Sequence, residues 1–321
     1  MRIINAIKYI HTPVSILLLM CIGLLFSCES LVNDLDQDKL PKVEAKLVIS
    51  CYISPQSPRF EAIITESQPL FGPATYDPII VENAEVILSD DVSQVRLLFD
   101  DSLSTYLADK SALKIVAGKT YTLTVNDGKR FVKAKCTVPV NRVKVMELSV
   151  DKEWVGYETD STAWFNFSWE DVKGESNYYA LRGSYIQEQT LPRADPETGK
   201  IAPFRYSSIT EMIAFERGVY NDVNLDGIKF ISPRTGAHIP SNKTITYQDE
   251  TGADKSLEIN PLVKDVRIEV MCIDEHYYKF RRSLENNNDN PFVEPTLVYT
   301  NVEGGLGCFA SFNAVGKTVN P

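Results

Sequence analysis

The sequence predicts a mainly β protein: an N-terminal immunoglobulin-like β-sandwich followed by a second β-rich, fibronectin-like domain with a short helix. Short segments in which apolar and polar residues alternate recur along the chain, and turn residues separate them. Only residues 274–287 have apolar side chains at a convincing helical spacing. The expected order is a signal peptide (1–27), an acidic tether (28–44), the sandwich (45–140) and the second domain (141–321).

The first 27 residues have the three parts of a secretory signal. Arg2 and Lys8 give a positive start, residues 14–26 form an uncharged apolar run, and Ser27 precedes Cys28. The 13 residues of that run rise only about 20 Å as a helix, which is short of the ~30 Å hydrocarbon core. A cleaved export signal is therefore a better interpretation than a permanent transmembrane anchor.

Residues 25–28, Leu-Phe-Ser-Cys, resemble a bacterial lipobox, in which the thiol of Cys28 receives a diacylglyceryl group. Each buried CH₂ contributes about 0.8 kcal/mol, so two or more acyl chains form a stable anchor. An ordinary signal peptide that leaves Cys28 as a free thiol is the alternative. The acidic residues after Cys28 resemble the export signals of surface lipoproteins from Bacteroidota. We therefore expect a lipid-anchored outer-membrane protein that faces the cell surface.

The chain is acidic, with 33 Lys and Arg against 43 Asp and Glu. Removal of the signal peptide takes away two basic residues, so the mature chain of 294 residues has a net charge of −12. This balance argues against nucleic-acid binding, which depends on Lys and Arg that neutralise phosphates. The same argument excludes electrostatic docking on anionic lipid.

The first domain reads as a series of short strands. Residues 47–53 form a buried-type strand, and residues 84–88 alternate as a strand with one buried face would. In residues 121–125 apolar side chains alternate with threonines, and Asp127-Gly128 then predicts a hairpin whose partner strand is 131–138. Strands at this spacing predict an antiparallel sandwich.

The second domain opens with apolar alternations over 165–169 and 179–181, which a turn over 171–177 separates. Together they resemble a fibronectin-type strand pair. Residues 186–210 contain three prolines and a glycine, which predicts a long loop excursion. Asp274 is placed to cap the expected helix.

Four cysteines remain beyond the signal region, two in each expected domain. An even number in an oxidising compartment permits disulfides, and we favour Cys51–Cys136 and Cys272–Cys308 among three possible pairings. Buried reduced thiols are the alternative. The sequence contains no Cys-x-x-Cys motif, so it gives no support for a zinc site.

Catalytic signatures are absent from the sequence. The mature chain has only His238 and His276, and it contains neither Gly-x-Ser-x-Gly nor His-Glu-x-x-His. A pair of catalytic carboxylates has no sequence signature, so a glycosidase-like enzyme is the alternative. We expect a protein that is not an enzyme.

Two groups of residues are candidate binding sites. Asp222, Asn224 and Asp226 match the start of an EF-hand loop and could bind calcium, although Pro233 replaces the bidentate Glu. A plain turn is the alternative, and we expect no other cofactor. Strand alternation places Trp164 opposite the core face, where it could contact a ligand beside Trp154 and Tyr157. The alternative is that the 186–210 excursion covers Trp164.

Residues 290–295 and 299–309 are the most distinctive stretch, with the sequences Asn-Pro-Phe-Val-Glu-Pro and Tyr-Thr-Asn-Val-Glu-Gly-Gly-Leu-Gly-Cys-Phe. They resemble the closing signature of a Bacteroidota outer-membrane lipoprotein family of the domain-of-unknown-function 4249 type. Further motifs agree with this resemblance: Asn83-Ala84-x-Val86, Gly118-Lys119-Thr120-Tyr121 and Asn177-Tyr178-Tyr179. Because members are often encoded beside TonB-dependent receptors, the resemblance implies a role in uptake at the outer membrane.

The expected function is that of a lipid-anchored outer-membrane accessory protein, which acts with a TonB-dependent transporter in nutrient uptake. A self-sufficient surface lipoprotein that binds a glycan, a peptide or a metal chelate is the alternative. The resemblance carries over no catalytic residues.

Overall fold

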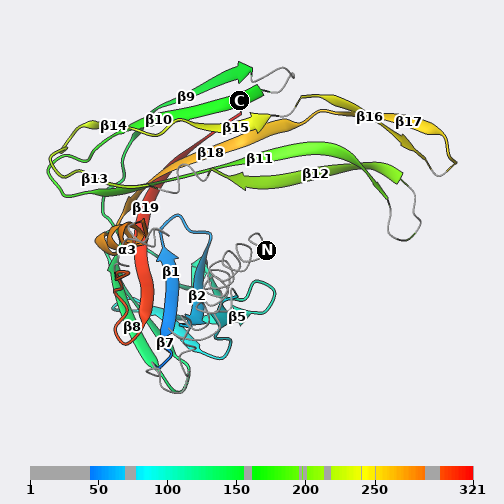
Figure 1. Cartoon of the computed structure of the whole chain (residues 1–321). Coiled ribbons are helices and arrows are strands. Elements are labelled where there is room, and N and C mark those ends of the chain that lie inside the picture. The colour runs from blue at the N-terminus through cyan, green and yellow to red at the C-terminus, as the bar shows by residue number, and fades with distance from the viewer. Residues whose placement is uncertain are drawn as a thin grey trace, which may run out of the picture. The chain divides into compact units, whose positions relative to one another are not determined.

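The computed structural model describes residues 44–68, 77–154, 161–194, 197, 201–212, 218–239, 241–249, 251–285 and 297–320. The predicted lipidation site Cys28, the signal peptide, nearly all of the tether, and Tyr157 lie outside these residues. The described residues from Ala45 onward belong to one compact unit. Among them, no helix has the length and apolar character needed to cross a membrane. The predicted mainly β fold with a short helix is confirmed (Figure 1).

The N-terminal half is built from strands whose side chains alternate between the core and the surface. The strands are β1 (Leu47–Ile53), β2 (Arg59–Glu66), β3 (Ile79–Ile80), β4 (Glu85–Ser89), β5 (Gln94–Asp100), β6 (Thr105–Asp109), β7 (Thr120–Asn126) and β8 (Phe131–Thr137). In β1 and β7 every second residue is buried, as the alternation predicts. The predicted hairpin at Asp127-Gly128 is also confirmed, with β7 and β8 as antiparallel partners and Gly128 at φ +85°.

The C-terminal half contains longer strands and a helix. Its elements are β9 (Val145–Trp154), β10 (Ser161–Glu170), β11 (Tyr178–Ala194), β12 (Ile201–Glu211), β13 (Val219–Asn221), β14 (Lys229–Ile231), β15 (Thr235–Ile239), β16 (Lys243–Gln248), β17 (Asp254–Ile259), β18 (Leu262–Ile273), α3 (Glu275–Glu285) and β19 (Leu306–Val319). Strands β9, β10, β14 and β15 form one sheet, and β16 and β17 form a separate hairpin. The predicted cap is confirmed, since Asp274 Oδ1 accepts a hydrogen bond of 2.8 Å from the backbone N–H of Tyr277.

One 13-stranded sheet runs through both halves. Eleven of its strands follow the order β12-β11-β18-β19-β1-β2-β6-β5-β4-β7-β8, and the other two are β13, which pairs with β11, and β3, which pairs with β2. The last strand makes this continuity possible, because β19 pairs in parallel with β1 over its first half and antiparallel with β18 over its second. Val302 and Phe309 therefore belong to the core of the N-terminal half. The division into 45–140 and 141–321 stays a prediction, and the structure adds that the C-terminal strand contributes to both sides of it.

Two glycines allow β19 to begin this close to β1. Gly307 has φ +93°, and a Cβ atom on it would lie 2.0 Å from the carbonyl oxygen of Ile49. A Cβ on Gly305 would lie 2.7 Å from the carbonyl oxygen of Leu47. Only residues without a side chain fit here, so the glycines of the closing signature serve the joint between the two halves.

The expectation of a long loop over residues 186–210 is wrong. These residues form the end of β11 and most of β12, which pair antiparallel from Ser184 opposite Glu211 to Ala194 opposite Ile201. Pro192 lies opposite Pro203, beyond the point where the pairing of β11 with β18 ends at Glu188. Both prolines are therefore in a part of the sheet that has only two strands, where each strand has an unpaired side on which a missing N–H is tolerated.

The two strands of the expected fibronectin-type pair lie in different sheets. β10 belongs to the four-stranded sheet and β11 to the large sheet, and the turn between them crosses from one layer to the other. The predicted faces are right, since Phe165, Phe167 and Trp169 are buried together with Tyr179 and Leu181. Trp169 contacts Tyr179 edge-on with ring centroids 5.9 Å apart. The second core thus lies between the two sheets.

Candidate functional site

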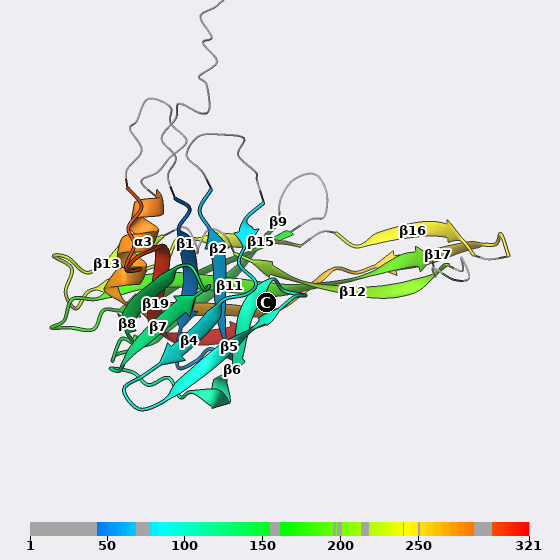
Figure 2. The ribbon, with the colours of Figure 1, turned by 90° about the horizontal axis from the view of Figure 1, so that it is seen from below.

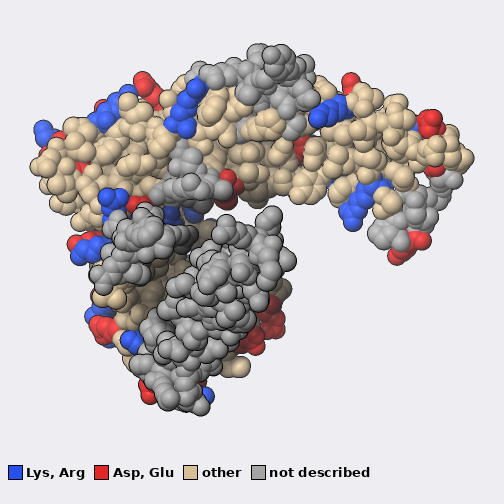
Figure 3. All heavy atoms as spheres, viewed as in Figure 1, with Lys and Arg blue, Asp and Glu red and all other residues tan. Residues whose placement is uncertain are grey.

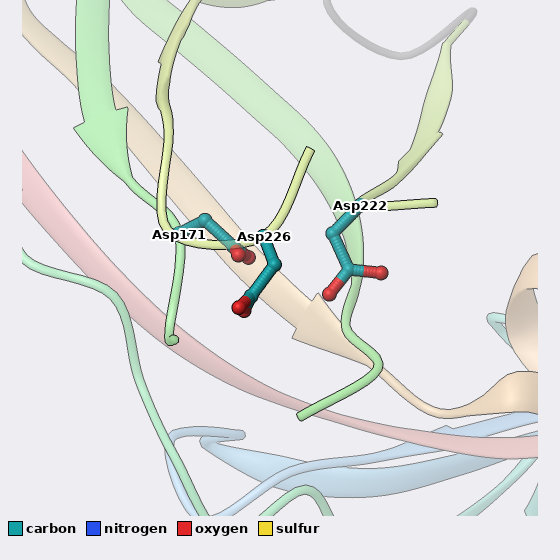
Figure 4. Close-up of side chains that lie close together, drawn as sticks. All are labelled: Asp171, Asp222 and Asp226. Carbon is teal, nitrogen blue, oxygen red and sulfur yellow. The ribbon is translucent and has the colours of Figure 1, made fainter. Parts of the chain in front are cut away.

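Three aspartates from separate segments meet at one end of the second core (Figure 4). Asp171 directly follows β10, Asp222 directly follows β13, and Asp226 lies in the turn before β14. One carboxylate oxygen from each lies within 4.8 Å of the others. We call these residues the three-carboxylate cluster.

Backbone N–H groups hold each carboxylate in place. Asp171 Oδ2 accepts from Gly227 N at 2.7 Å, and Asp226 Oδ1 accepts from Gly174 N at 2.7 Å. Asp222 Oδ2 accepts from Asn177 N at 2.9 Å. The segment 171–177 and the segment 222–227 therefore fix each other through the same three side chains. The other oxygen of Asp171, Oδ1, accepts a hydrogen bond of 2.5 Å from the hydroxyl of Tyr179.

The cluster concentrates negative charge in a partly dry place. Asp171 and Asp222 are buried, whereas Asp226 is exposed. In the described part of the chain no Lys or Arg forms a salt bridge with any of the three, although the stem of Lys173 passes beside Gly227. Buried charges normally need a partner. Hard oxygen donors of this kind suit Ca²⁺, which would supply that partner.

The sequence identified two of these three residues. It predicted Asp222 and Asp226, but it placed Asn224 with them where the structure places Asp171. Asn224 adopts a left-handed conformation at φ +64°, as a turn residue does. Asp171 is 51 positions before Asp222, and only the crossing between the two sheets brings it to the loop. No local signal could have predicted that contact.

The predicted aromatic site of Trp164, Trp154 and Tyr157 stays a prediction, because Tyr157 and the side chain of Trp154 lie outside what the structure describes. Trp164 lies on the face of β10 opposite Phe165, and the guanidinium of Arg234 lies over its ring at 4.5 Å. The backbone of Trp154 pairs with Ser161, three residues before Trp164 on β10. Arg234, from the connection between β14 and β15, therefore covers part of Trp164. The 186–210 segment, which was the expected cover, contributes to β11 and β12.

The four cysteines among the described residues are buried, and none of them is in a disulfide. The predicted Cys272–Cys308 pairing is wrong, because Cys272 lies opposite Asn313, five residues beyond Cys308 on β19. That offset is roughly 16 Å at strand spacing, and a disulfide needs Cα atoms within about 7 Å. Cys51 and Cys136 are not bonded either. Burial raises the pKa of Cys51 to about 12 and that of Cys272 to about 11, so these thiols are unreactive.

Figure 3 shows both Lys or Arg and Asp or Glu side chains scattered over the described residues of the visible face. The expectation that the chain does not bind nucleic acid stays a prediction.

The comparisons with known proteins give a family and no characterised relative. No curated protein sequence matches the chain significantly. Residues 30–318 match the family described as "Domain of unknown function (DUF4249)". That match covers the tether, both halves of the fold and almost all of β19. The expectation that the chain is of the domain-of-unknown-function 4249 type is therefore confirmed, whereas the Bacteroidota source and the lipid anchor stay predictions, and the chain belongs to the DUF4249 family.

Proposed function

We propose that this protein is a lipid-anchored outer-membrane accessory protein that acts with a TonB-dependent transporter in nutrient uptake. The lipobox at Cys28 and the acidic tether support the anchor and the surface location. The observation that carries the proposal is an exposed β edge, which suits a protein partner.

This edge belongs to what we call the β-arm: residues 189–194 of β11, residues 201–211 of β12, and the hairpin β16–β17. Figure 2 shows these ribbons running side by side. Residues 189–194 pair only with β12, because the pairing of β11 with β18 ends at Glu188. Strand β12 is the edge of the large sheet.

The β-arm has little core of its own. No residue of β12 or β16 is buried, and Phe204, Tyr206 and Ile209 are exposed on β12. Two-stranded ribbons are marginally stable in water, and an exposed edge strand with apolar side chains is a template for pairing with another chain. The β-arm therefore has the chemistry of a surface that another protein covers.

Capture from the membrane tests this proposal. Tagged full-length protein is purified from detergent-solubilised outer membranes, and its partners are identified by mass spectrometry. We expect a β-barrel receptor near one-to-one with the wild type, and its loss with Cys28→Ser and with Tyr206→Asp on β12. Val92→Asp is the matched control, because Val92 is an exposed aliphatic residue far from the β-arm in the sheet order. A preparation without a barrel in mild detergent would overturn the proposal.

The alternative is a self-sufficient surface lipoprotein that binds a glycan, a peptide or a metal chelate. One observation favours it: the same large sheet also has an open groove with arginines on its floor. The two functions separate on whether the purified protein binds a ligand without a receptor.

A further inference from the structure

The strands β11, β18 and β19 have one face in the second core and one face largely uncovered. Leu181, Ile268 and Val270 point into the core, so their neighbours Arg182 and Glu269 lie on the opposite face. Helix α3 packs over one end of this face, against β19 and β11. Beyond the helix the face is open.

Two adjoining cavities form a groove along this open face. The cavity beside α3 has a volume of about 220 Å³, and its lining includes the apolar residues Ala180, Val219, Met271 and Phe312 together with Arg281. The second has a volume of about 410 Å³, and its lining includes Arg182, Arg267, the segment Gln56–Pro58, and Ile209 and Glu211 of β12. Arg182 and Phe312 line both cavities, and the guanidinium of Arg182 lies 5.7 Å from the centroid of the Phe312 ring. Apolar side chains thus lie directly beside the two arginines.

A buried carboxylate positions the two arginines. Glu269 Oε2 accepts from Nε and Nη2 of Arg182 at 2.7 and 2.5 Å, and its Oε1 accepts from Nε and Nη2 of Arg267 at 3.0 and 2.6 Å. Gly316, opposite Glu269 in the register, leaves room for the glutamate, since a Cβ there would lie 2.8 Å from Glu269 Cγ. The arrangement is therefore built across three strands.

The two arginines are exposed to the groove, whereas the glutamate that holds them is buried. Glu269 is only 4% exposed, whereas the side chains of Arg182 and Arg267 are 45% and 60% exposed. Within the described residues, Nη1 of neither arginine makes a hydrogen bond. Burial acts to raise the pKa of Glu269, but the two guanidinium groups outweigh it and lower that pKa. One buried carboxylate thus holds two permanent cations, whose outer N–H groups face the cavity. Glu211 of β12 also lines this cavity, so a ligand carboxylate has to bind on the side of the two arginines.

We infer that this groove binds a small carboxylate whose apolar group lies next to the acid. The carboxylate accepts hydrogen bonds from the outer edges of Arg182 and Arg267, and the apolar group packs on Phe312 and Met271. Two sources share this chemistry: a peptide C-terminus with an apolar last residue, and a free fatty acid. The site goes beyond the proposed docking to a receptor and does not depend on it.

Calorimetric titration of the full chain, made soluble by Cys28→Ser, tests the site. The probes are N-acetylphenylalanine and its amide, which differ only in the charge of the acid group. We expect the acid to bind and the amide to bind about tenfold more weakly, because a hydrogen bond between charged groups is lost. Equal binding of acid and amide, or no binding of the acid, would overturn the inference.

Variants locate the site. Arg267→Gln should weaken binding of the acid about tenfold, and Arg267→Lys should keep part of the affinity because it keeps the charge. Arg205→Gln is the matched control: Arg205 is an exposed arginine paired with Glu188 in the β-arm, away from the groove. An equal loss of affinity in Arg205→Gln would contradict the assignment. Octanoate distinguishes the sources, since tighter binding than N-acetylphenylalanine indicates a fatty acid and weaker binding a peptide terminus.

Discussion

The N-terminal half and strand β12 of the β-arm lie at opposite ends of one hydrogen-bonded sheet, yet they differ in what stabilises them. In the N-terminal half, β1 and β7 bury every second side chain in a shared apolar core. In the β-arm, β12 and β16 bury none. A hydrogen bond contributes only about 0.5–1.5 kcal/mol net, and burial of a large apolar side chain about 1.5–3 kcal/mol. The hydrogen bonds of a continuous sheet therefore do not show which of its parts contribute most to stability. Because the β-arm contributes little to the core, its side chains are available to contact a partner protein.

The largest effect is expected at the joint between the halves. Gly307→Ala places a methyl group 2.0 Å from the carbonyl oxygen of Ile49, at φ +93°. We expect a loss of about 5 kcal/mol or more in the free energy of unfolding, or no folded protein. Urea denaturation followed by tryptophan fluorescence measures it.

Gly252→Ala is the control for backbone strain alone. Gly252 lies between β16 and β17 with φ +78°, and nothing is within 4 Å of a Cβ there. Its replacement should cost only about 1 kcal/mol. Similar losses for both glycines would mean that the close approach of β19 to β1 is not what requires Gly307.

Side-chain truncation tests the comparison directly. Phe309→Ala removes a fully buried ring that β19 contributes to the N-terminal core, and we expect it to cost about 3–5 kcal/mol. Tyr206→Ala removes an exposed ring of the β-arm and should change stability by less than about 0.5 kcal/mol. Urea midpoints measure both. If Tyr206→Ala were as costly as Phe309→Ala, the β-arm would have a core of its own.

Calcium should add stability at the three-carboxylate cluster. At about fifty times the dissociation constant, Ca²⁺ is expected to stabilise the protein by about 2 kcal/mol, or roughly 4–6 °C in Tm. Asp226→Asn should remove this response to Ca²⁺ and EDTA. Asp249→Asn, in the turn of the β-arm where Asp249 bonds Thr251, should leave it unchanged. If the Tm of the wild type did not change with Ca²⁺, the three-carboxylate cluster would be a hydrogen-bonded turn and not a calcium site.

The smallest effect concerns pH and the groove. The pKa of Glu269 is lowered from 4.5, since Arg182 and Arg267 outweigh its burial. The ionised form is thus favoured by folding, so its contribution is present above pH 4.5 and is lost as the pH falls through the lower folded pKa. The stability difference between wild type and Glu269→Gln should be largest near neutral pH and shrink in acid. A difference that does not change with pH would contradict this role.

Local features of the fold were predictable, and distant contacts were not. Alternation gave the right faces for Tyr121 and Phe165, and Asp274 was identified as the helix cap. Pro192 and Pro203 led to the wrong prediction of a loop. Whether a proline interrupts a strand depends on its place in the strand pairing, and the register of that pairing was not predictable from the sequence. Asp171 and Glu269 acquire their roles only from strands far along the chain.

The double pairing of β19 also determines when this protein is able to fold. Gln56, just after β1, accepts a hydrogen bond from Ala314, 258 positions later. Until the last residues have been made, β1 lacks its neighbour and the first core lacks Phe309. Contacts of such separation form slowly and leave an open strand edge in the meantime. The N-terminal half of this chain is therefore completed only when its C-terminus arrives, and the loss of the final strand would affect the beginning of the protein as much as its end.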